Sequence, residues 1–101
     1  MKSQEKLTSE QRVRGSRVLQ ALAHPLRLGI VQALAESPLT CSELQELMGC
    51  PQPTLSLQLK VLVDQGLVAT CKEGTVKRCS IRNRDFLKLF TCLHRHLSEV
   101  L

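Results

Sequence analysis

The stretch TCSELQELMGCPQPTLSLQLKVL, residues 40–62, decides the fold that the sequence predicts. Thr40 and Glu43 have the spacing of a capping box, which marks the start of a helix. Gly49 is a typical C-terminal stop, and Pro53 suits the first turn of another helix, where its missing N–H costs nothing. The stretch therefore predicts a helix, a tight turn of about three or four residues and a second helix.

Both helices have an apolar face. On the first, the residues predicted to face the core are Leu44, Leu47 and Met48. On the second, at about 100° per residue, they are Leu55, Leu59 and Leu62. The other side of the second helix carries small, uncharged and mostly hydrogen-bonding side chains and a lysine. These residues are Pro53, Ser56, Leu57 and Lys60, with Thr54 and Gln58 at the flanks.

Such a side fits the major groove of DNA. Short hydroxyl and amide side chains reach base edges there, and an apolar one can touch a thymine methyl. The first helix opens with Thr40 and Ser42, where backbone N–H groups can hold a phosphate. The alternative is a solvated helix between two others, and composition alone favours neither interpretation.

Two further helices are predicted before this stretch. The first is capped by the box from Thr8 to Gln11 and runs to about Ala23. Its apolar stripe consists of Val13, Val18, Leu19 and Leu22. The second starts at Pro25 and is apolar almost all round, which predicts a central position. Its apolar residues are Leu26, Leu28, Ile30, Val31 and Leu34.

The segment that follows predicts a hairpin and a final helix. Gly66 ends the preceding helix, and LVATCKEGTVKRCSI, residues 67–81, favours two strands with a turn at Glu73-Gly74. Its tip carries Lys72, Lys77 and Arg78, which are suited to DNA backbone contacts. From Asn83 to Leu101 a near-heptad stripe predicts an interface helix. The stripe consists of Phe86, Leu89 or Phe90, Leu93, Leu97, and Val100 or Leu101.

Composition narrows the class of protein. The 101 residues predict a flexible N-terminus over residues 1–7 and a single domain over residues 8–101. A formal charge of +5 suggests a polyanionic partner. The only aromatic residues are Phe86 and Phe90, which argues against single-stranded nucleic acid, whose bases stack on aromatic rings. Without a Gly-rich phosphate loop, paired carboxylates or a Cys/His nucleophile spacing, an enzyme is not expected.

The sequence also bears on location. It has no apolar run near the length of a membrane span and no apolar stretch typical of a signal peptide, so a cytoplasmic protein without membrane contact is expected. Five cysteines are an odd number, and a reducing compartment disfavours a disulfide framework. We therefore expect free thiols, metal ligands or core residues.

Two segments resemble the ArsR/SmtB family of bacterial repressors. They are LAHPLRLGIVQALAE, residues 22–36, and PLTCSELQELMGCPQPTLSLQLKVLVDQGLVATCKEG, residues 38–74. The resemblance covers about residues 17–100. It implies a mainly α winged helix-turn-helix of about five helices with a two-stranded wing. It also implies a homodimer through the first and last helices, which binds double-stranded DNA at an inverted-repeat operator until an inducer releases it.

The resemblance assigns positions as well as a fold. The implied reading positions are Gln52, Pro53, Thr54, Ser56, Leu57 and Gln58. The family usually has Ser at Pro53 and Arg or His at Leu57, so the operator sequence should differ from those of better-known members. The residues expected in the dimer interface are Val18, Leu22, Phe86, Phe90, Leu93 and Leu97.

The inducer site stays open between metal and thiol chemistry. Arsenic-responsive members carry a C-x-C pair where this chain has Thr40 and Ser42, with Cys41 between them, and a single thiolate cannot form a three-sulfur site. The family's site on the terminal helix corresponds to Asn83, Asp85, His96 and Glu99. Paired antiparallel helices would bring Asp85 near His96 and Glu99 of the other chain, as ligands for zinc or nickel. The alternative roles are N-capping by Asn83 and a favourable helix dipole interaction for Asp85.

The cysteines offer the thiol alternative. Cys41 lies at a helix N-terminus, which favours a lowered pKa, and Cys41 and Cys50 bracket one helix. Cys71 and Cys79 are predicted to face each other across the hairpin if its loop is symmetric about Thr75. Cys92 lies four residues before His96 on one helical face. The alternative for each is a small buried hydrophobic residue.

These observations favour a sequence-specific, double-stranded DNA-binding repressor that a thiol, redox or metal signal releases. DNA binding itself requires no cofactor. The competing hypothesis is a protein-interaction module on the same fold that has lost DNA binding, for which the outward-facing Leu57 is the main argument.

Overall fold

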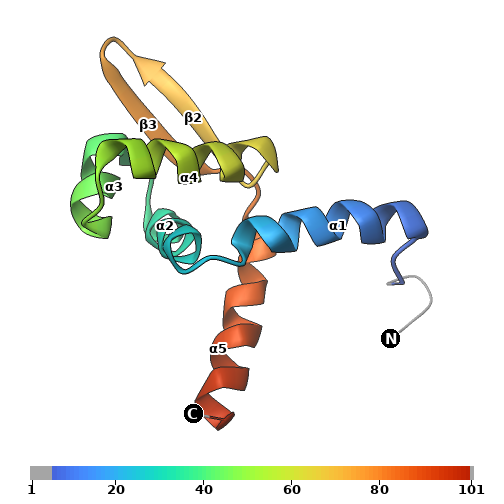
Figure 1. Ribbon diagram of the computed structural model, residues 1–101. Coiled ribbons are helices and arrows are strands. Elements are labelled where there is room, and N and C mark those ends of the chain that lie inside the picture. The colour runs from blue at the N-terminus through green and yellow to red at the C-terminus, as the bar shows by residue number, and fades with distance from the viewer. Residues whose placement is uncertain (1–5, 101) are drawn as a thin grey trace.

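The computed structural model describes residues 6–100 and has the architecture of a winged helix-turn-helix (Figure 1). Its helices are α1 (Ser9–Leu22), α2 (Pro25–Glu36), α3 (Cys41–Met48), α4 (Gln52–Asp64) and α5 (Lys88–Val100), with a short 3₁₀ helix η2 (Arg84–Leu87). Its strands are β1 (Leu39–Thr40), β2 (Val68–Glu73) and β3 (Val76–Ile81). Most of the predicted flexible N-terminus, and Leu101 at the other end, lie outside the described residues.

The helix ends are set by local chemistry. Thr8 and Thr40 both form the predicted capping boxes; the Glu43 N–H donates to Thr40 Oγ1 at 3.1 Å, and the Thr40 N–H donates to Glu43 Oε1 at 2.8 Å. Gly49 ends α3 with φ of 62°, a left-handed conformation that favours glycine. Helix α4 begins at Gln52, one residue earlier than predicted, because extended Pro51 occupies the N-cap and Pro53 fits within the first turn.

The sheet has one strand more than the predicted two-stranded wing. Its order is β1-β3-β2, with both neighbouring pairs antiparallel. Glu73 pairs with Val76, so Gly74 and Thr75 form a two-residue loop. Gly74, the first loop residue, has a φ of 64°, a left-handed conformation that favours glycine. The short strand β1 joins the start of α3 to the wing.

The hairpin register corrects one prediction about the cysteines. Thr70 pairs with Cys79 and Cys71 pairs with Arg78, so Cys71 and Cys79 do not face each other. The centre of the loop lies between Gly74 and Thr75, and not on Thr75 as the prediction required. Because side chains alternate along a strand, Cys71 is exposed and Cys79 is fully buried.

The core forms around α2, as its all-round apolar sequence predicted. The fully buried residues of α2 are Ile30, Val31 and Leu34. They lie in one cluster with Leu44 of α3 and with the leucines of α4, Leu55, Leu59 and Leu62. The prediction for Leu47 was wrong: it is 63% exposed, because Leu44 and Met48 already cover the contact of the short α3 with the body.

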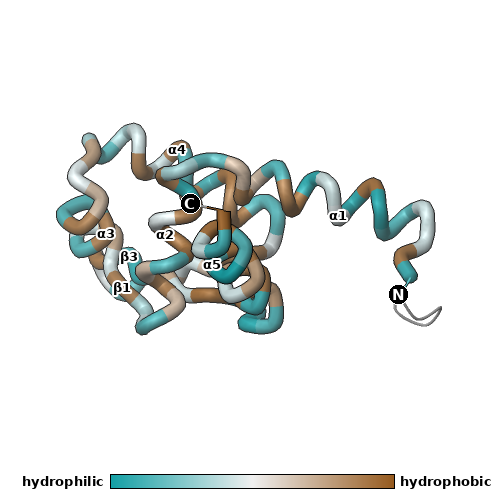
Figure 2. The backbone as a smooth tube through the Cα atoms, turned by 90° about the horizontal axis from the view of Figure 1, so that it is seen from below, coloured by the Kyte–Doolittle hydropathy of each residue, from teal (hydrophilic) through white to brown (hydrophobic). Residues whose placement is uncertain are grey.

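Helices α1 and α5 extend away from this body, α5 on the side opposite α4 and the wing (Figure 1). Figure 2 shows hydrophobic and hydrophilic residues interleaved along α1, which reaches out from the rest of the molecule. The final segment is not one helix from Asn83: the Asn83 side chain caps η2 by accepting from the Asp85 N–H at 2.9 Å, and α5 starts at Lys88.

Helix α5 leaves an apolar stripe uncovered. It has no buried residue among those described, and Leu89, Leu93 and Leu97 are 39–44% exposed. Phe86 and Phe90 pack partly against the core. Within residues 6–100, no single helix combines the length and hydropathy that crossing a bilayer requires; α1 and α2 reach both only when taken together, and they are bent by 91°.

Candidate nucleic-acid interface

The outward side of α4 is open to solvent, as the sequence predicted. Its exposed residues are Gln52, Pro53, Ser56, Leu57 and Lys60, while Thr54 and Gln58 are half-buried at its flanks. Leu57 is 61% exposed, whereas the leucines on the opposite side of the helix are at most 2% exposed. The helix therefore docks by its leucines and presents mostly small polar side chains to solvent.

Two of these polar side chains are linked. Gln52 Nε2 lies 3.1 Å from Ser56 Oγ, one turn further along α4, and donates a hydrogen bond to it. Gln52 keeps its carbonyl oxygen and its second amide hydrogen, and Ser56 keeps its hydroxyl hydrogen. The pair therefore presents donors and an acceptor in a fixed arrangement, which suits contact with base edges.

Gln58 is held differently from the other predicted reading residues. Its Oε1 accepts a hydrogen bond from Arg27 Nη1 at 2.6 Å. Arg27 also donates from Nε to the Ala21 carbonyl oxygen at 2.6 Å and from Nη2 to the Gln20 carbonyl oxygen at 3.3 Å. Gln58 thus connects α4 to the junction of α1 and α2, and its amide oxygen is already engaged.

A groove joins the start of α3, the outward side of α4 and the wing. Its lining residues are Thr40, Cys41, Ser42, Gln45, Gln52, Leu55, Ser56, Thr75, Val76 and Lys77. The capping box takes the N–H groups of both Thr40 and Glu43, so the predicted phosphate contact through the Thr40 N–H is wrong. The first-turn N–H groups of Cys41 and Ser42 remain for a phosphate at the edge of this groove. The groove therefore brings five of the predicted DNA-binding residues to one face of the molecule, namely Thr40, Ser42, Gln52, Ser56 and Lys77.

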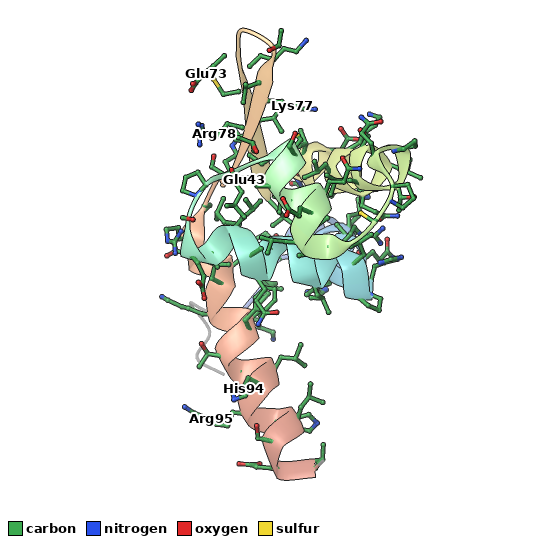
Figure 3. All side chains as sticks on the ribbon, turned by 90° about the vertical axis from the view of Figure 1, so that its left-hand side faces the viewer. Glu43, Glu73, Lys77, Arg78, His94 and Arg95 are labelled. Atoms are coloured by element: carbon green, nitrogen blue, oxygen red, sulfur yellow. The ribbon has the colours of Figure 1, made fainter. Side chains whose placement is uncertain are left out.

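The basic residues of the wing do not all share a side. Lys72 and Lys77 are directly paired across the hairpin, while Arg78 pairs with Cys71 on the other side. Figure 3 shows Lys77 and Arg78 on opposite sides of the hairpin, with Lys77 on the side of α3 and α4. Arg78 Nε lies 4.0 Å from Glu73 Oε1, in an exposed ion pair. Lys77 is therefore the wing cation best placed beside the groove.

The cysteines occupy three kinds of environment. Cys71 and Cys92 are exposed, and Cys50 is half-buried. Cys41 is half-buried and Cys79 is buried, and their Sγ atoms lie 3.6 Å apart. Burial, followed by the hydrogen bond with Cys41, raises the pKa of Cys79 to about 12. The sequence did not predict this pair, because the two-residue strand β1 leaves no pattern to detect. Strand β1 places Leu39 opposite Cys79 and so brings Cys41 close.

The proposed metal ligands do not converge within one chain. Asp85 lies in η2, whereas His96 and Glu99 lie on α5, and all three are exposed. Among residues 6–100, no three His, Cys, Asp or Glu side chains are close enough to share a metal ion. A site built from Asp85, His96 and Glu99 would therefore need ligands from a second chain. Asn83, the fourth matching position, is occupied as a cap.

Helix α3, the turn at Gly49, helix α4 and the β2–β3 hairpin define a winged helix-turn-helix protein. A helix-turn-helix domain family model matches residues 22–71. The chain is 40% identical over 72 residues to an arsenical resistance operon repressor of Staphylococcus xylosus, covering 71% of this chain and 68% of that protein. These matches, together with a structural match described next, show that the chain belongs to the ArsR/SmtB family. The members of this family are transcriptional regulators and not enzymes.

Other relatives agree in fold and in name. A biofilm growth-associated repressor of Xylella fastidiosa is 45% identical over 53 residues, which are 52% of this chain and 46% of that protein. The chain thus spans about half the length of this relative. The solution structure of a homodimeric winged helix-turn-helix DNA-binding domain from Mycobacterium bovis, a possible ArsR-family regulator, matches with a TM-score of 0.78. That match has 28% identity and covers 91% of this chain and 89% of that one.

Proposed function

We propose that the protein is a dimeric, cytoplasmic repressor that binds an inverted-repeat operator in double-stranded DNA and leaves it when an inducer binds. The observation that carries this proposal is the outward side of α4, where Gln52 and Ser56 stand exposed in a groove beside Lys77. Membership of a family of transcriptional regulators supports it, and so does the net charge of +5.

In this proposal, α4 enters the major groove and its neighbours fix the register. Gln52, Thr54 and Ser56 contact base edges, and Leu57 contacts a thymine methyl. Thr40 through its hydroxyl and Ser42 through its backbone N–H contact phosphates at the start of α3, and so do Lys60, Lys72 and Lys77. Arg78, on the other side of the wing, contributes less. Such phosphate contacts supply most of the affinity and make it dependent on salt. Gln58 acts indirectly, because its bond to Arg27 holds α4 in place.

The second copy docks on the uncovered faces of α1 and α5. An apolar pocket between these helices is lined by Leu19, Leu22, Ala23, Leu28, Leu89, Phe90, Cys92, Leu93 and His96. Leu22 is already buried within its own chain, so Leu19, Leu89 and Leu93 offer more surface to a partner. Dimerisation must place the two α4 helices about 34 Å apart to reach successive turns of one duplex.

The decisive experiment measures binding of the protein to a labelled duplex from the promoter of its own gene by fluorescence anisotropy. The salt concentration is varied from about 50 to about 200 mM, a range over which the affinity from phosphate contacts falls steeply. A scrambled duplex of equal length is the control. We expect tighter binding to the promoter duplex and a steep loss of affinity with salt for both. Absence of binding even at low salt would contradict the proposal and favour the protein-interaction module, for which Leu57 would be the contact.

A further inference from the structure

Two thiols from separate elements meet at the edge of the groove. Cys41 is the first residue of α3, and Cys79 lies in the middle of β3. Their sulfur atoms are 3.6 Å apart. Among the five cysteines, this is the pair that the fold brings into sulfur contact. The first-turn position of Cys41 leaves it half-buried, whereas Cys79 is 0% exposed.

We propose that Cys41 and Cys79 form a reversible disulfide that weakens operator binding, so that this pair is the site at which an oxidant acts as inducer. The inference rests on the proposed function and specifies its signal. A disulfide has sulfur atoms about 2.05 Å apart, so closure needs an approach of about 1.5 Å from the 3.6 Å of the reduced pair. Side-chain rotation and a small shift of α3 toward β3 supply this approach.

The groove gives an oxidant access to one thiol only. Cys41 lines the groove together with Ser42, Gln52 and Lys77, whereas Cys79 lies behind it in the core. Burial and the contact with Cys41 keep the Cys79 thiol protonated, since they raise its pKa, against the opposing charge of Lys77. Because the thiolate is the reactive form, Cys41 reacts first and Cys79 resolves the product.

With a peroxide as oxidant, the chemistry balances in two steps. The Cys41 thiolate attacks one peroxide oxygen; the O–O bond breaks, the other oxygen leaves as hydroxide and takes up the thiol proton as water, and Cys41 becomes a sulfenic acid. Cys79 then loses its proton and attacks Cys41 Sγ; an S–S bond forms, the S–O bond breaks and a second water leaves. Two thiols lose two electrons in total, and one hydrogen peroxide is reduced to two waters.

The position of the bond explains its effect on DNA binding. Cys41 precedes Ser42, whose backbone N–H we place against a phosphate, and Cys79 follows Lys77 and Arg78 on the wing strand. A bond between them draws the start of α3 and the wing together. Because interiors are closely packed and transmit strain, the groove between α3, α4 and the wing changes shape, and phosphate contacts made in the reduced form are lost.

The test uses the full chain in three forms. The first retains only the pair, through the changes Cys50→Ser, Cys71→Ser and Cys92→Ser; the second and third add Cys41→Ser or Cys79→Ala. Each is treated with hydrogen peroxide and mapped by mass spectrometry after digestion, then its operator affinity is measured with and without dithiothreitol. Circular dichroism checks that each variant is folded, which matters most for Cys79→Ala because that site is buried.

We expect an intramolecular Cys41–Cys79 disulfide in the first form only. In that form, we expect affinity for the operator to fall about tenfold on oxidation, within the range of about 5 to 150-fold typical of coupled sites, and to return with reductant. Failure to find the disulfide would overturn the inference, and so would a mapped disulfide with unchanged affinity. If neither redox form binds DNA while the disulfide forms, the proposed function fails and its regulation by this pair fails with it.

Discussion

Arg27 Nη1 donates a hydrogen bond to Gln58 Oε1 at 2.6 Å and thereby ties the start of α2 to the middle of α4. The same guanidinium donates to the carbonyl oxygens of Gln20 and Ala21 at the end of α1. Both carbonyls lie in the last turn of α1, where the Gln20 oxygen also accepts from the Ala23 N–H at 3.2 Å. One side chain therefore fixes how α1, α2 and α4 meet, and with them the position of the proposed reading face.

We predict that Arg27→Met destabilises the protein by about 2 kcal/mol, since methionine keeps much of the apolar stem but loses hydrogen bonds that involve a charged donor. Urea unfolding followed by circular dichroism measures this change. The matched control is Arg14→Met on the exposed surface of α1, where a change within about 0.5 kcal/mol is expected. Equal stability of the two variants would contradict the role assigned to Arg27.

The hydrogen bond between Gln52 and Ser56 leads to a prediction about specificity. Ser56→Ala and Gln52→Ala should each weaken operator binding by about 1 kcal/mol, with little change on a scrambled duplex. Because the two side chains are in contact, the double variant should lose less than the sum of the single losses. Anisotropy titrations of the four proteins complete the cycle. Equal affinity of wild type and Ser56→Ala for the operator would show that the reading face is misplaced.

Much of this face could be predicted from the sequence, because the period of the leucines in α4 leaves only one polar side. The capping boxes and the stop at Gly49 were also local signals, and they fixed the boundaries of α3. The β1–β3 contact was not predictable in this way. A strand of two residues has no period to detect, and its pairing with β3 joins parts of the chain that are distant in sequence.

The errors have physical reasons of the same kind. Leu47 matches the helical period, but α3 is too short to bury both its apolar edges, and Leu44 with Met48 already fills the contact. The facing of Cys71 and Cys79 depended on loop length, and a shift of one residue moves a side chain to the other face of a strand. The bond between Gln58 and Arg27 joins residues 31 positions apart and left no local signal.

The position of Lys77 beside the groove leads to a prediction about salt. Lys77→Ala should weaken binding to operator and scrambled duplexes alike and should reduce the slope of log affinity against log salt by about 1. The matched control is Arg78→Ala on the opposite side of the wing, which already has Glu73 nearby and should change the slope less. A loss confined to the operator would place Lys77 at a base instead of a phosphate.

The uncovered stripe of α5 leads to a prediction about assembly. Leu93→Asp with Leu97→Asp should give a folded monomer, because neither side chain is buried in the single chain and their replacement chiefly weakens the proposed contact with a second copy. Light scattering coupled to gel filtration measures the mass. The control is Leu57→Asp, an exposed leucine on α4 that should leave the dimer intact. A double variant that remains dimeric would place the interface elsewhere.

The capping box at Thr40 leads to a prediction about pH. Hydrogen bonds with Thr40, through its backbone first and its side chain next, lower the pKa of Glu43 below its usual 4.5. A carboxyl with a lowered pKa in the folded state stabilises the fold above its unfolded pKa, and this contribution disappears as the pH falls through the folded value. The free energy of unfolding of the wild type should therefore decrease more steeply below about pH 4.5 than that of Glu43→Gln.

The Glu43→Gln variant isolates this ionisation. Glutamine at the third helical position still accepts from the backbone N–H of the cap, so the two proteins share their capping geometry and differ in one titrating group. Urea unfolding from about pH 3 to about pH 7 covers the range in which carboxylates titrate. The difference in the free energy of unfolding between the two proteins should be largest near neutrality and shrink with acid. Because Glu43 is fully exposed, high salt should diminish the charge-dependent part of the difference, and parallel curves at low salt would contradict the lowered pKa.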